Sequence, residues 1–159
     1  VHSLLSSAGW RPLEVGKLCQ EIVSATLQGI PLGKHIDFEI TPSQEQINSN
    51  QAHHLTMVIH ELTTNTMKYA LKERQHACIN IEIDQNETTM RILFKDNGPG
   101  YPDYMLQEDF HPSSVGFELI RGITQRSLQG SVYLSNDNGA ATCIIFENEL
   151  VHKEERITQ

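Results

Sequence analysis

One segment, from residue 51 to about residue 72, carries the strongest helical pattern of the chain and constrains the rest of the fold. Its apolar side chains recur at spacings of three and four residues, which places them on one face of a helix. These residues are Leu55, Val58, Ile59, Leu62, Thr66 and Tyr69. Two stretches that alternate apolar and polar residues follow, at 77–84 and 89–95, and they predict a β-hairpin that turns at 85–88.

The remaining segments predict an α+β protein. Pro12 is expected to open a helix whose apolar stripe runs from Leu13 to Leu27, and residues 35–40 alternate as a strand does. A helix capped by Ser113 or Ser114 should run to about residue 128. The other elements are a loop at 101–113, strands at 130–135 and 141–147 joined by a turn at 136–139, and a polar, frayed tail at 148–159.

Because helices and antiparallel hairpins alternate unevenly along the chain, we expect a two-layer α/β sandwich. Its sheet should be mixed and mostly antiparallel, with the helices on one face.

Composition narrows the possible functions. The 159 residues fit one domain, and the net charge of −8 argues against a general nucleic-acid binder, which normally has a basic surplus. The longest purely apolar run, at 143–146, has four residues and cannot span a bilayer. Cys19, Cys78 and Cys143 are widely spaced and flanked by apolar residues, which predicts buried reduced thiols and fits the cytosol. The chain begins with Val, so we expect it to be a fragment of a longer protein.

A polar stripe borders the apolar face of the long predicted helix. Its members are Glu61, Asn65, Lys68 and Lys72. An amide oxygen suits Mg²⁺, a lysine neutralises phosphate charge, and a carboxylate can orient or activate an attacking group. The stripe therefore has the groups that hold a metal–phosphate moiety, although a solvated helix face with i,i+4 neighbours would have the same pattern.

Two glycine-containing segments add to this pattern. The first, 96–100, directly follows a predicted strand; its glycines let backbone approach a flat ligand, and Asp96 can accept a hydrogen bond from an exocyclic amine. The second has Gly116 at the start of a predicted helix, where free N–H groups suit a phosphate. Taken singly, the first is compatible with an ordinary turn and the second with a capped helix that needs a small residue for packing.

The order and spacing of these segments are more specific than each segment alone. The pattern H-E-L-x-x-N-x-x-K-Y-A at 60–70, D-x-G-x-G at 96–100 and the helix start at 114–117 resemble the N, G1 and G2 boxes of the ATP-binding catalytic domain of sensor histidine kinases, in the GHKL superfamily. The resemblance covers residues 13–147 and implies the Bergerat-type ATP-binding fold. Residues 116–130 are similar to the subgroup whose phosphoacceptor domain is of the second HisKA type.

The resemblance implies roles for individual residues. Asp96 would accept the adenine amino group, and Gly98 and Gly100 would let the ring lie close. Asn65 would bind the Mg²⁺ that bridges the phosphates of ATP, and Glu61 would be the catalytic residue that orients or activates the attacking group. The rest of the implied cofactor-binding set is Lys68, Lys72, Tyr101, Ser114, Val115, Gly116, Phe117 and Thr142.

Within this set the lysines would contact phosphate, and the helix start around Gly116 would cradle it. Residues 101–115 would form a mobile lid, with Tyr101, Met105 and Phe110 as apolar pins. The family often has Thr beside the glycine that precedes the last strand, whereas this chain has Ala140 there.

The implied function is that of the catalytic domain of a two-component sensor histidine kinase. It would hold Mg-ATP and transfer the γ-phosphate to a histidine on a separate helical domain of the same full-length protein, and so serve a response regulator indirectly. Residues 1–12 would end that helical domain and link it to the catalytic domain at 13–147, with 148–159 as a C-terminal tail. His2 lies far from the usual acceptor position, so the isolated chain is not expected to phosphorylate itself.

Two alternatives stay open at this point. One is an anti-sigma-type serine protein kinase with the same ATP site, and the other is a nucleotide-binding regulatory module without catalysis, against which the intact Glu61 and Asn65 argue. In each case we expect no nucleic-acid partner and no direct membrane contact by this domain. The expected location is cytoplasmic, with a full-length parent that is either membrane-anchored or soluble.

Overall fold

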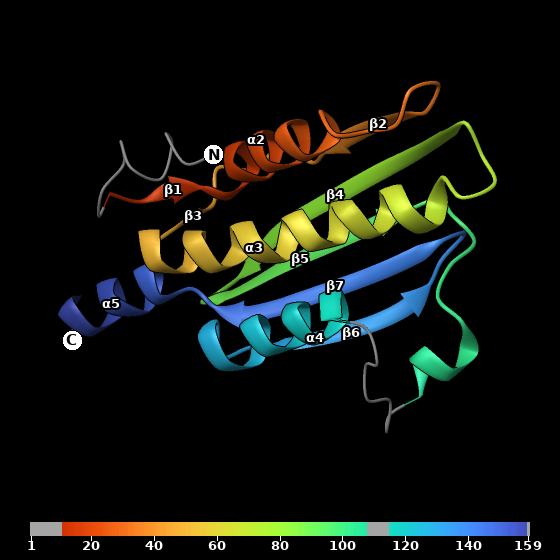
Figure 1. Cartoon of the computed structure of the whole chain (residues 1–159). Coiled ribbons are helices and arrows are strands. Elements are labelled where there is room, and N and C mark those ends of the chain that lie inside the picture. The colour runs from red at the N-terminus through yellow and green to blue at the C-terminus, as the bar shows by residue number, and fades with distance from the viewer. Residues whose placement is uncertain (1–10, 108–114, 159) are drawn as a thin grey trace.

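A five-stranded sheet forms one layer of the protein, and three helices cover one of its faces (Figure 1). The strands, in spatial order, are β2 (His35–Ile40), β4 (His76–Asn86), β5 (Thr89–Asp96), β7 (Ala140–Glu147) and β6 (Ser131–Asn136). The covering helices are α2 (Val15–Leu27), α3 (Ser49–Asn65) and α4 (Val115–Gly122). The computed structural model describes residues 11–107 and 115–158, without the side chains of 115 and 152–156.

The sheet is mixed, as predicted. Strand β2 pairs with β4 in parallel, and the other three pairs are antiparallel. Alternate side chains of each strand point toward the helices. Ile81, Ile92 and Ile144 are fully buried on that inner face, in one cluster with Leu55 and Ile59 of α3. The prediction of a two-layer sandwich with helices on one face is therefore confirmed.

The N-terminal helix begins later than predicted. Pro12 is followed by the short strand β1 (Leu13–Glu14), which pairs with β3 (Gln46–Ile47), and α2 starts only at Val15. The Val15 N–H donates to the Glu45 carbonyl at 3.0 Å, so pairing with a distant segment sets where this helix starts. Residues 1–10, where the end of a preceding helical domain was predicted, lie outside the described residues.

The long helix changes its winding near its end. Helix α3 begins at Ser49 and is capped by Asn48, whose side chain accepts the Gln51 N–H at 2.8 Å. After Asn65 the chain continues as a π turn, η1 (Thr66–Ala70). The predicted apolar face is buried except at Tyr69, which is 58% exposed. The wider π turn rotates the later residues relative to a regular α-helix, which takes Tyr69 off the buried stripe.

The second half of the chain follows the predicted order. A short 3-10 helix, η2 (Asp103–Leu106), interrupts the predicted loop, and a second π turn, η3 (Ile123–Ser127), extends α4. Strands β6 and β7 flank the predicted turn. Ser113 and Ser114, the predicted caps of α4, lie outside the described residues, as do 108–112.

The C-terminal segment is ordered, and the prediction of a frayed tail is wrong. Asn148 is fully buried, and its Nδ2 donates to the Gln46 carbonyl and to Gln85 Oε1, each at 2.7 Å. Its backbone N–H donates to the Thr88 carbonyl at 2.7 Å, and helix α5 (Glu149–Thr158) follows. A buried polar residue with distant partners orders this segment, and hydropathy patterns do not reveal such contacts.

The prediction of buried thiols holds for one cysteine of the three. Cys19 is fully buried, and burial raises its pKa to about 12. Cys78 and Cys143 are half-buried, because their positions in β4 and β7 point away from the helices. Among the described residues, no helix is both long and apolar enough to cross a membrane.

Candidate functional site

A cavity of about 440 Å³ lies where the π turn after α3, the end of β5 and the start of β7 meet. Its lining is mostly apolar, with a few convergent polar groups, as is usual for small-molecule sites. The lining residues are Leu62, Asn65, Thr66, Tyr69, Ala70, Lys72, Phe94, Asp96, Pro99, Gly100, Tyr101, Pro102, Tyr104, Met105, Phe117 and Ala140. Segments that are far apart in the sequence therefore meet around one space.

The Asp96 carboxylate is held in place from three directions. Its Oδ1 accepts the Gly98 N–H at 2.9 Å and the Ala140 N–H at 3.3 Å. Its Oδ2 accepts the Thr66 hydroxyl at 3.1 Å. These contacts fix the side chain at the end of β5, and a carboxylate oxygen retains a lone pair for a ligand in the cavity.

Gly98 is required by close packing. A Cβ at this position would lie 2.7 Å from the Ala70 Cβ and 2.9 Å from the Ala70 Cα. The loop after β5 therefore packs directly on the π turn, and this contact brings Asp96 and Thr66 within hydrogen-bond distance of each other.

Glu61 and Asn65 face the first turn of α4. A Cβ on Gly116 would lie 3.2 Å from Glu61 Oε2 and 3.7 Å from Asn65 Oδ1. Asn65 lines the cavity, and its side chain makes no hydrogen bond to another described residue, so its amide oxygen is available to a ligand. The Asn65 amide oxygen, with the Glu61 carboxylate one helical turn away, fits a Mg²⁺ ion that keeps several waters.

The two lysines of the predicted stripe differ in their position relative to the cavity. Both are exposed, but Lys72 lines the cavity and Lys68 is not among the lining residues. The π turn lies between Asn65 and Lys72, so the regular α-helical spacing that put all four stripe residues on one line does not hold there.

Tyr101 lines the cavity with its hydroxyl turned toward β7. Its hydroxyl lies 2.5 Å from Thr142 Oγ1, and its ring packs edge-on against Phe117 with 5.6 Å between centroids. Asn136 holds the Tyr101 backbone by two hydrogen bonds, accepting the N–H at 2.7 Å and donating to the carbonyl at 2.9 Å. Burial, followed by the nearby Asp96 charge, raises the pKa of Tyr101 to about 12.

Replacing Tyr101 with Phe should reduce the loss of folding stability at high pH. The unfolded tyrosine titrates near 10, so between pH 10 and 12 the unfolded chain binds fewer protons than the folded chain. The free energy of unfolding of the wild type therefore falls as the pH rises over this range. Tyr101 contributes up to about 1.4 kcal/mol per pH unit to this fall. Urea unfolding at a series of alkaline pH values would measure both slopes, and equal slopes would contradict the buried, neutral phenol.

About half of the predicted site residues line the cavity. Those that line it are Asn65, Lys72, Asp96, Gly100, Tyr101 and Phe117. Gly98 and Thr142 do not line it but hydrogen-bond to Asp96 and Tyr101, which do. Gly116 lies near Asn65, and Glu61 lines a separate pocket between α2, α3 and α4. Ser114 and Phe110 lie outside the described residues, as does the side chain of Val115, the first residue of α4.

Two residues of the site were missed. Thr66 was assigned to the apolar face of the long helix, yet its hydroxyl binds Asp96. A lone hydroxyl in a buried stripe is a signal for a polar partner, although it does not say which one. Asn136 was assigned to a turn, and nothing in its local sequence indicates that it holds Tyr101.

A family comparison bears directly on this site. The sequence model of the family described as "Histidine kinase-, DNA gyrase B-, and HSP90-like ATPase" matches residues 50–152, which include α3, the loop after β5 and the described part of α4. The chain belongs to this family. The predicted membership of the GHKL superfamily is therefore confirmed.

Curated relatives of this ATPase domain include two topoisomerase subunits. The B subunit of type 2 DNA topoisomerase 6 from Pyrococcus horikoshii is 30% identical over 77 residues, and that of Thermococcus sibiricus is 31% identical over 77 residues. Each match covers 48% of this chain and 14% of the relative. The chain thus spans a small part of the length of these curated relatives.

Solved structures of histidine kinases share the fold. The histidine kinase domain of the Erythrobacter litoralis EL346 blue-light activated kinase has a TM-score of 0.71 at 16% identity, covering 89% of this chain and 64% of that one. The catalytic domain of histidine kinase ThkA also has a TM-score of 0.71, at 17% identity, covering 87% and 96%. The mycobacterial sensor histidine kinase MprB has a TM-score of 0.68 at 14% identity, covering 87% and 97%. This ATPase domain therefore has the fold of histidine kinase catalytic domains.

Proposed function

We propose that this chain is the ATP-binding catalytic domain of a sensor histidine kinase. It binds Mg-ATP and transfers the γ-phosphate to a histidine on a separate helical domain of the same full-length protein. The observation that carries the proposal is that Asp96 and Asn65, from β5 and α3, line one cavity. Family membership and the shared fold support the same conclusion.

The adenine ring is proposed to lie against the Asp96 end of the cavity. The free lone pair of its carboxylate suits the exocyclic amine of adenine, and Phe94 and Ala70 offer apolar surface to the ring. The phosphates then extend toward Asn65 and the first turn of α4. There, backbone N–H groups and the Lys72 ammonium offset their negative charge.

The reaction is proposed to need positioning more than covalent help. The bond between the γ-phosphorus and the oxygen that bridges to the β-phosphate breaks, a bond to an imidazole nitrogen of the acceptor histidine forms, and ADP leaves. Glu61 orients that imidazole and accepts its N–H proton. Mg²⁺, when bound, neutralises phosphate charge, and Asn65 is the residue proposed to hold it.

Replacing Asn65 with Ala should remove the advantage that Mg²⁺ gives to nucleotide binding. We expect affinity for ATP in magnesium buffer to fall by at least about tenfold, or about 1.4 kcal/mol. Affinity in EDTA should change much less, because the amide acts through the ion. Calorimetry under both conditions measures this difference. Unchanged affinity in magnesium would remove Asn65 from the metal site and favour a nucleotide-binding module without catalysis.

Phosphoryl transfer is tested with ATP labelled on the γ-phosphate. The isolated chain should take up no stoichiometric acid-labile label, whereas the helical phosphoacceptor domain of its own full-length protein should become labelled when added in trans. Stoichiometric acid-labile label on the isolated chain would overturn the assignment of the acceptor to another domain. Acid-stable label on a partner serine would instead identify a serine kinase with the same ATP site.

A further inference from the structure

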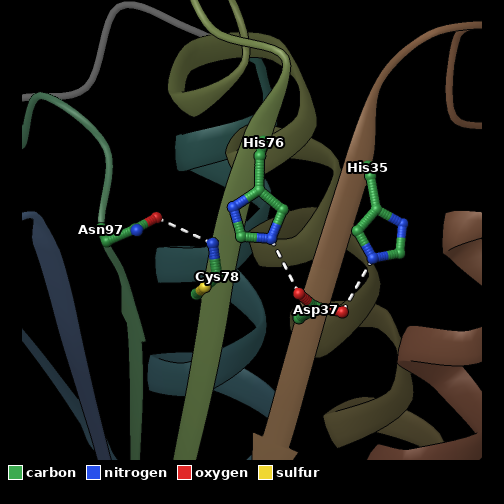
Figure 2. A network of polar contacts seen from close by, with 5 residues as sticks. All are labelled: His35, Asp37, His76, Cys78 and Asn97. Atoms are coloured by element: carbon green, nitrogen blue, oxygen red, sulfur yellow. Dashed lines mark hydrogen bonds and ion pairs between the residues drawn. The ribbon is translucent and has the colours of Figure 1, made fainter.

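A cluster of metal-ligating side chains lies on the outer face of the sheet, which α2, α3 and α4 do not cover. Its members are His35 and Asp37 of β2 and His76 of β4 (Figure 2). The Nε2 atom of His35 lies 2.7 Å from Asp37 Oδ1, and the Nε2 atom of His76 lies 2.7 Å from Asp37 Oδ2. All three side chains are at least half exposed.

The backbone register brings the three groups together. His35 and His76 are direct partners in the parallel pairing of β2 and β4, and their rings stack with centroids 5.6 Å apart. Asp37 lies two residues beyond His35, so it projects from the same face of the sheet. The positions of these side chains therefore follow from paired strands, which hold them more rigidly than a loop would.

Packing does not account for this cluster. The three side chains contribute to no buried core, and exposed ion pairs of this kind add little to stability. Two imidazoles and a carboxylate do form a donor set that suits divalent first-row transition metals, with zinc the commonest example.

The spacing of the donor atoms fits one ion. One ligand atom from each residue lies within 4.8 Å of the others. In a tetrahedral zinc site with bonds of about 2.0–2.2 Å, ligand atoms are separated by about 3.3–3.6 Å. Small rotations of the three side chains would therefore open the present contacts enough to admit an ion between them.

We propose that His35, Asp37 and His76 bind a divalent transition-metal ion of the zinc type through two imidazole nitrogens and one carboxylate oxygen, with water completing the coordination. The site uses no residue of the nucleotide cavity, so it does not depend on the proposed kinase function. Because its ligands come from both β2 and β4, a bound ion would fasten the edge strand to the rest of the sheet.

Zinc chloride titrated into the full chain by calorimetry, in nucleotide-free and chelator-free buffer, tests this site. We expect one ion per chain and, for His76→Gln or Asp37→Asn, affinity lower by at least about 100-fold. The matched control is the double variant His53→Gln/His54→Gln, which removes the adjacent histidine pair of α3 and should leave zinc affinity unchanged.

A second measurement tests whether His35 and His76 themselves bind the zinc ion. Zinc should shift the imidazole NMR signals of His35 and His76 and should raise the melting temperature of the wild type but not of His76→Gln. Zinc binding that survives His76→Gln and Asp37→Asn but disappears in the His53/His54 control variant would overturn the proposal. The absence of zinc binding by the wild type would overturn it as well.

Discussion

Replacing Asp96 with Asn should weaken ATP binding by about 10- to 150-fold, while the fold is kept. Asn has the same shape and retains one carbonyl oxygen, which can still accept the N–H groups of Gly98 and Ala140. The NH₂ group of Asn then takes the place of Oδ2. It lies beside Thr66, and the Thr66 hydroxyl can accept a hydrogen bond from it. A donor would thus face the adenine amino group, and the loss of a charge-assisted hydrogen bond is worth about 1.5–3 kcal/mol.

Calorimetry with ATP and GTP measures this effect and its specificity. Guanine has a carbonyl oxygen where adenine has the amine, so the variant should lose ATP affinity relative to GTP affinity. Asp137→Asn is the matched control, because Asp137 lies at the same end of the sheet and its exposed carboxylate pairs with the Lys95 ammonium. Its ATP affinity should stay within about twofold of the wild type. Equal ATP affinity in the Asp96 variant and the wild type would sink the proposed adenine contact.

Replacing Gly139 with Ala should destabilise the protein by at least about 3 kcal/mol. A Cβ on Gly139 would lie 1.9 Å from the Asp96 carbonyl oxygen, and the residue has a φ of +143°. The turn before β7 and the end of β5 would both have to move. A domain of this size has about 5–15 kcal/mol of stability in total, so the loss is a large share of it.

Gly122→Ala is the matched control for this substitution. Nothing lies within 4 Å of a Cβ built on Gly122, which has helical backbone angles. Alanine should therefore stabilise the helix by about 0.5–1 kcal/mol relative to glycine. Chemical unfolding of the wild type and both variants gives the two free-energy differences. A loss below about 1 kcal/mol for Gly139→Ala would contradict the close packing of this turn on Asp96.

The sequence predicted the elements whose patterns are local. The face of α3 and the alternation of β4 and β5 follow from residues within one segment, so helical and strand periodicity reveal them. The D-x-G-x-G segment was predicted to bind a ligand because its glycines let the backbone approach a flat ring and Asp96 can accept a hydrogen bond from an exocyclic amine.

Features that depend on distant contacts could not be predicted in this way. The π turn at Thr66–Ala70 takes Tyr69 out of the buried stripe, and no local signal marks it. Helix α5 follows Asn148, whose partners Gln46 and Gln85 lie far away in sequence. The His35 and His76 pair arises from the parallel register of two strands that are separated by a helix. Periodicity within one segment carries no information on such register.

The two ends of β5 place different demands on the chain. Just before one end, the Thr88 carbonyl accepts the backbone N–H of buried Asn148. At the other end Asp96 lines the cavity, about 26 Å away at the rise of an extended strand. Mutations around the hairpin at Thr88 should be tolerated as long as folding survives them. Mutations around Asp96 must satisfy folding and ligand chemistry together. We therefore expect sequence drift among related chains to be fast at the hairpin end and slow at the cavity end.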